Sequence, residues 1–125
     1  MSTVLHDVPS KVLFRNGVPP AEVTEPDAGS AVEFPTGDGP TFAVLMLGAT
    51  TGGAAVGVTF EQSHDGTTWV AVPDAGIPAQ GVAGAVIGVS FVRDRRYVRC
   101  QYDVTGDEGA TATVAVLLGQ PAKVF

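Results

Sequence analysis

The sequence is poor in the residues that most often carry catalysis, bind metals or contact nucleic acid. It has one cysteine, two histidines, and only seven lysines and arginines against thirteen acidic residues. A single cysteine, Cys100, excludes an internal disulfide and a cysteine-based metal cluster. The net charge of −6 argues against a nucleic-acid partner, because binding to phosphates requires a basic surface.

Long apolar runs are lacking as well. No segment approaches the roughly 18 residues that a membrane-spanning helix needs, and the first residues contain no apolar core of a signal peptide. We therefore expect no membrane partner, and synthesis in the cytoplasm without export.

Glycine (16) and proline (9) are abundant, and they separate short stretches in which apolar and polar residues alternate. Such alternation is typical of half-buried strands, since successive side chains of a strand point to opposite faces. Between residues 42 and 119 the pattern predicts six strands, with turns recurring every eight to twelve residues and no convincing helix. The sequence therefore predicts an all-β fold, an antiparallel β-sandwich of jelly-roll or immunoglobulin-like kind.

The clearest strand signal lies in residues 96–119. Two alternating runs, 98–104 and 112–118, are separated by five turn-forming residues, which predicts an antiparallel hairpin. A shorter hairpin is expected around Asp65-Gly66, with Trp69 in its second strand and at least half buried. Residues 73–81 are expected to form a loop. Cys100 falls on the core face of its strand, so we expect an inert, buried thiol.

The first forty residues differ from the rest, because they hold six of the nine prolines and yet contain several apolar groups. We interpret residues 1–40 as an extended arm with short strands near 12–14 and 31–34, and residues 41–125 as the sandwich domain. The arm packs on the domain or on a neighbouring subunit in this interpretation; the alternative is a frayed N-terminus. Its candidate partner-binding residues are Leu5, Leu13, Phe14 and Phe34.

Arginines between residues 93 and 99 form the one basic cluster. Arg95 and Arg96 are candidates for pairing with acids of another chain, including the acidic arm, and the alternative is solvated turn charge. The consecutive Ser63, His64 and Asp65 contain the letters of a catalytic triad, but neighbours in sequence cannot place the base between the nucleophile and the acid.

No metal or cofactor site is predicted. His6 and His64 have no partner that suggests zinc, and the acids near residues 103–108 do not have the spacing of a calcium-binding loop. Without a catalytic or metal constellation, the sequence predicts a protein that is not an enzyme.

Residues 58–73 (VTFEQSHDGTTWVAVP) and 95–121 (RRYVRCQYDVTGDEGATATVAVLLGQP) resemble small structural proteins of tailed bacteriophages. The resemblance covers about residues 42–121. It implies a virion component on the capsid surface, a decoration (cement) or minor head protein, made in the host cytoplasm. Its implied partners are other copies of itself and the major capsid protein, and it carries over no catalytic residues. The alternative function is a carbohydrate-binding or receptor-binding sandwich, since similar DG-x-x-W hairpins occur in such modules.

Overall fold

The structure of the protein is a computed structural model that describes residues 12–35 and 37–121, with side chains described from residue 15 to residue 120. All of its regular elements are strands, so the described residues contain no helix that could cross a membrane. The strands are β1 (Val12–Val23), β2 (Asp27–Ala28), β3 (Val32–Glu33), β4 (Gly39–Thr51), β5 (Ala55–Ser63), β6 (Val70–Gln80), β7 (Val86–Arg93), β8 (Tyr97–Thr105) and β9 (Thr111–Pro121).

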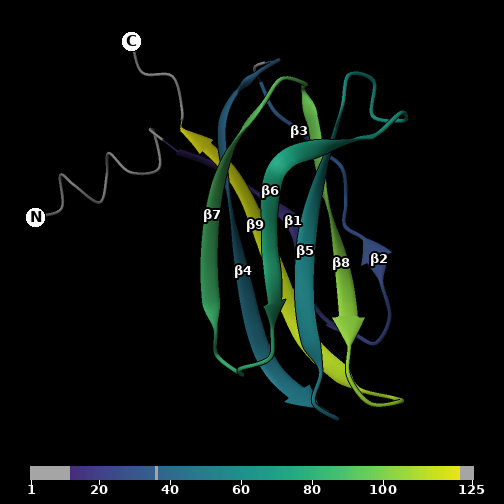
Figure 1. The fold of residues 1–125 in the computed structure, drawn as a ribbon. Coiled ribbons are helices and arrows are strands. Elements are labelled where there is room, and N and C mark those ends of the chain that lie inside the picture. The colour runs from purple at the N-terminus through teal and green to yellow at the C-terminus, as the bar shows by residue number, and fades with distance from the viewer. Residues whose placement is uncertain (1–11, 36, 122–125) are drawn as a thin grey trace, which may run out of the picture.

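The strands form two antiparallel sheets that pack face to face (Figure 1). The first sheet has the order β1-β9-β4-β7, and the second has the order β2-β8-β5-β6, with β3 also paired to β8. Along the chain, each connection changes sheet except the β5–β6 hairpin and the step from β2 to β3. This pattern of returning strands is a jelly roll. The prediction of an all-β antiparallel sandwich is confirmed, and the strand order selects the jelly-roll form.

The core lies between the two sheets and follows the alternation of each strand. Leu45 of β4, Val58 of β5, Val98 of β8 and Val116 of β9 are each at most 2% exposed, and they meet across the interface between the sheets. Cys100 lies among them with no exposed area, so its predicted place in the core is confirmed. The free cysteine behaves as a small apolar side chain.

The predicted hairpin of residues 96–119 is wrong, because its two strands belong to different sheets. β8 pairs with β5 in the second sheet, whereas β9 lies between β1 and β4 in the first. The connecting residues cross the end of the sandwich and are held against the β4–β5 connection, where the Asp107 amide donates to the Gly52 carbonyl at 2.9 Å. Gly106 fits this crossing at φ +142°, a conformation that other residues rarely adopt.

The expected loop at residues 73–81 is instead most of strand β6. β6 is an edge strand of the second sheet. Pro73 and Pro78 are tolerated in it because proline has no N–H to donate, and an edge strand has no neighbour on its open side. Asp74, at φ 56°, and two shifts of register accommodate the prolines. The hairpin from β5 into β6 around Asp65 is present as predicted, although Trp69 lies just before β6 rather than within it.

The part of residues 1–40 that the structure describes is built into the sandwich. β1 is an edge strand of the first sheet, and β2 and β3 pair with β8 in the second. Val18, Val23, Val32 and Phe34 all lie in the common core. The boundary expected at residue 40 therefore does not separate an arm from a domain among the described residues.

Candidate interaction surface

On strands β4, β7 and β9, three of the four strands of the first sheet, the outer face carries no charged side chain. We call this surface the β4 face. Its outward positions follow from the alternation with the buried Ala43, Leu45 and Leu47 and from the register of the neighbouring strands. They are Pro40, Phe42, Val44, Met46, Gly48, Thr50, Val86, Gly88, Ser90, Val92, Thr113, Ala115, Leu117 and Gly119.

The β4 face is apolar because β4 contains the uninterrupted apolar run of residues 42–48. A sheet of an antiparallel sandwich usually alternates between apolar inward and polar outward residues. Here Val44, Met46 and Leu117 occupy outward positions and are only partly buried, while Val86 and Val92 of β7 are 64% and 74% exposed. Exposed apolar residues gathered on one uncharged face make the β4 face a candidate interaction surface.

A shallow hollow of about 300 Å³ lies on this face between β4 and β7. It is lined by Phe42, Val44 and Ser90 together with the backbone around Gly88, which has no side chain to fill the space. The hollow has no charged group in its lining, so it fits an apolar side chain of a partner better than an ionic ligand.

The outer face of the second sheet is polar by contrast. The Arg99 Nε donates to Glu61 Oε1 at 2.8 Å, and Gln101 Nε2 donates to the same oxygen at 3.0 Å. The Arg99 guanidinium also lies 4.5 Å from the centroid of the Trp69 ring. Trp69 is partly buried, as predicted, and Arg99 covers one face of its ring.

Beside this cluster a groove of about 430 Å³ runs over β5 and β8. Gly57 leaves room for it, and Thr59, Gln101, Asp103 and Thr105 supply hydrogen-bonding groups along its wall. No basic side chain lines the groove, so an anionic ligand has no counter-charge there.

Of the four apolar residues expected to bind a partner, Phe34 is placed in the core of its own chain. It is 1% exposed and lies beneath the guanidinium of Arg93. Leu13 and Phe14 lie on β1, where their backbones pair with Gln120 and Gly119 of β9. Leu5 lies outside the described residues.

The two arginines expected to pair with another chain both contact acids within their own chain. Arg96 Nη1 lies 3.7 Å from Glu33 Oε2, and both side chains are about half exposed. Arg95 Nε lies 3.9 Å from the carboxylate of its neighbour Asp94. Arg96, Glu33 and Arg15 line a shallow hollow of about 220 Å³ together with Phe34 and Pro35.

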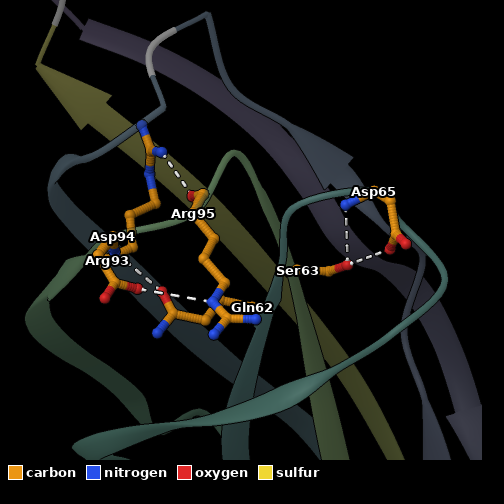
Figure 2. Close-up of polar contacts among 6 residues, drawn as sticks. All are labelled: Gln62, Ser63, Asp65, Arg93, Asp94 and Arg95. Atoms are coloured by element: carbon orange, nitrogen blue, oxygen red, sulfur yellow. Dashed lines mark hydrogen bonds and ion pairs between the residues drawn. The ribbon is translucent and has the colours of Figure 1, made fainter.

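Ser63 and Asp65 hold a turn (Figure 2). The Ser63 hydroxyl donates to Asp65 Oδ1 at 2.9 Å, and the same carboxylate oxygen accepts from the amides of Thr67 and Thr68 at 2.9 Å. These hydrogen bonds hold the pKa of Asp65 well below its usual range, those from Thr68 and Thr67 most strongly. Within the described part of the chain, no group of three or more His, Cys, Asp and Glu side chains is placed to hold a metal ion.

The contribution of β7 to an interaction surface was not predicted from the sequence. The signal was present in the alternation of Val86, Gly88, Ser90 and Val92, since none of these outward residues is charged. It was also present in the apolar run of β4, which predicts a strand covered on both faces.

Comparisons with known proteins support the fold only. No model of a known protein family matches the sequence, and no curated protein matches it. A chain in the structure of infectious bursal disease virus, Gx strain, is similar in fold over 90% of this protein, with a TM-score of 0.50 and 12% sequence identity. This protein spans 32% of the length of that chain.

Proposed function

We propose that this protein is a non-enzymatic structural component of a virion, a decoration protein that binds and stabilises the head lattice of a tailed bacteriophage. The observation that carries the proposal is the β4 face, an uncharged and largely apolar outer sheet surface. Exposure of apolar side chains to water is unfavourable, and soluble monomers rarely expose large apolar patches. Binding of a partner to the β4 face would remove this apolar area from solvent.

Two further observations support a virion role. The fold is a jelly roll, an architecture used by viral capsid proteins, and the similar chain reported above belongs to the structure of a virus. The hydroxyl of Ser63 and the carboxylate of Asp65 form hydrogen bonds that hold a turn. The occurrence of Ser, His and Asp at positions 63–65 therefore has a structural explanation, which is consistent with a non-enzymatic role.

The experiment is co-sedimentation with heads assembled from the major capsid protein that the same genome encodes. The native protein should sediment with the heads in a saturable amount. A Val44→Lys variant should lose this binding because it places a charge in the centre of the β4 face, while Thr59→Lys, an exposed position on the other sheet, should bind as the native protein does. Native protein that stays in the supernatant at all concentrations overturns the proposal.

A second candidate function is glycan binding in the groove over β5 and β8. Thr59, Gln101, Asp103 and Thr105 offer the neutral and acidic oxygen and amide groups that bind sugar hydroxyls. Titration with neutral disaccharides such as maltose, cellobiose and lactose should shift the backbone resonances of these residues. A Gln101→Ala variant should abolish the shifts, and unchanged spectra of the native protein reject this function.

A further inference from the structure

We propose that strand β7 pairs with β7 of a second copy of this chain, antiparallel about a two-fold axis at Val89, so that the two first sheets become one continuous sheet. The inference concerns the free protein and does not depend on the virion role. The edges of the two sheets differ in how they are protected from pairing with another chain.

Edge strands expose unpaired N–H and C=O groups, and proteins usually protect them with prolines, bulges, charges or short strands. Three edges of this sandwich have such protection. β1 contains Pro19 and Pro20 and two shifts of register, and β6 contains Pro73, Pro78 and the left-handed Asp74. At the other edge of the second sheet, β2 and β3, which both pair with β8, are only two residues long each.

β7 has none of these protective features. It is eight residues long, contains no proline, and pairs with β4 in an unbroken register from Val86 to Arg93. Its one charged residue, Arg93, points into the core and has no exposed area. Among the described residues no strand pairs with its other side, and Figure 1 shows β7 at the open margin of its sheet.

The side chains of β7 are also left incompletely covered at this edge. Val86 and Val92 are 64% and 74% exposed on the outer face, and Ile87 and Val89 on the inner face are only partly buried against the core. A strand added beside β7 would cover both rows.

A second copy of β7 fits this edge because the strand is complementary to itself. With the axis at Val89, residue 86 of one copy lies opposite residue 92 of the other, and 88 lies opposite 90. On the outer face, Val86 then lies opposite Val92 and Gly88 opposite Ser90, and each pair occurs once on either side of the two-fold axis. No charges of equal sign meet, which matters for two chains of net charge −6 each.

The register can be tested with cysteine variants of the otherwise intact chain, whose native Cys100 is buried. In the proposed register, Val86→Cys protein mixed with Val92→Cys protein should form disulfide-linked dimers under mild oxidation, because opposite residues lie within disulfide range. Each variant alone should remain uncrosslinked, since neither residue faces itself.

The association itself is tested by sedimentation equilibrium of the purified protein. The Val86→Lys, Val92→Lys double variant places ammonium groups opposite each other at both ends of the pairing and should raise the dimer dissociation constant by about a hundredfold or more. A Thr59→Lys, Val70→Lys double variant makes the same charge change at exposed positions of the second sheet and should dimerise as the native chain does.

A native chain that remains monomeric up to about 1 mM overturns the inference. So does a dimer that survives the Val86→Lys, Val92→Lys change, because it must use another surface. Native protein that dimerises but stays in the supernatant in the co-sedimentation experiment would reject the virion role and leave this inference standing.

Discussion

The guanidinium carbon of Arg93 lies 4.4 Å from the centroid of the Phe34 ring, so a residue of the N-terminal forty is clamped beneath a buried cation of β7. Arg93 also donates through Nη1 to the Arg95 carbonyl at 2.9 Å and through Nη2 to the side-chain oxygen of Gln120. At the same end of the sandwich, the Asp94 amide donates to Gln62 Oε1 at 3.0 Å (Figure 2). Polar side chains thus close this end of the core.

Replacing Phe34 with alanine should destabilise the protein by about 3–5 kcal/mol, because it removes a fully buried ring and the surface on which Arg93 stacks. Phe34→Leu should cost less, about 1–2 kcal/mol, since most of the volume remains. Urea unfolding followed by circular dichroism measures both values. A Phe34→Ala protein of native stability that no longer associates would place this ring in a partner interface instead.

Gly29→Ala should be strongly destabilising, because a Cβ at this position would lie 2.4 Å from the Gly17 carbonyl oxygen and 2.9 Å from Val18 Cγ2. Overpacking of this kind costs on the order of 1–3 kcal/mol or more. Gly37→Ala is the matched control, since a Cβ there meets nothing within 4 Å, and its effect should stay within about 0.5 kcal/mol. Equal thermal midpoints for the two variants would contradict the close approach of the chain at Gly29.

Cys100 should resist thiol reagents in the native state and should make stability fall at alkaline pH. Burial raises the pKa of its thiol from 9.0 to about 12. Because the folded pKa lies above the unfolded one, the stabilisation is complete below pH 9 and is lost as the pH rises toward 12, by roughly 4 kcal/mol at most. Unfolding free energies measured between pH 8 and about 11 should fall less steeply for Cys100→Ala, and labelling of the native protein at pH 8 should be slow unless denaturant is added.

In the runs 98–104 and 112–118, alternation in the sequence predicted which side chains point toward the core. Val98, Cys100, Val114 and Val116 are all buried as their spacing predicted. The same alternation could not predict which strands are neighbours, because period-two spacing fixes the face of a side chain and says nothing of the path of a loop. The hairpin of residues 96–119 failed for this reason, since the contact of Asp107 with Gly52 carries the chain to the other sheet.

The prolines also led to two wrong predictions. They predicted an arm before residue 40 and a loop at residues 73–81, but Pro19, Pro20, Pro73 and Pro78 all lie in strands at sheet edges. A proline without an N–H is tolerated wherever its open side has no neighbouring strand, and the identity of the edges is known only once both sheets are assembled. The interaction surface on β4 and β7 depends on the same tertiary information.

The turn at Asp65 should loosen at low pH. Its folded pKa is depressed, so its contribution is present above the ordinary carboxyl pKa and is lost as the pH falls through the lower folded value. The amides of Thr67 and Thr68, which donate to this carboxylate at 2.9 Å, should exchange faster with solvent in Asp65→Ala than in the native protein at pH 7. Asp103→Ala, at an exposed carboxylate on β8, should leave their exchange unchanged.

Two truncations separate the described sandwich from the residues before it. Deleting residues 2–11 leaves every described strand in place, so the protein should keep its β circular dichroism and unfold at nearly the native urea concentration. Deleting residues 2–20 removes most of β1, which pairs with β9 from Val12 to Val23 and contributes Val18 to the core. That deletion should lower the free energy of unfolding by several kcal/mol or prevent folding, because β9 loses one of its two neighbours.

The shorter deletion also tests Leu5, since head binding that disappears with residues 2–11 while the sandwich stays folded would assign partner contact to that segment. Unchanged stability after the longer deletion would contradict the pairing of β1 with β9.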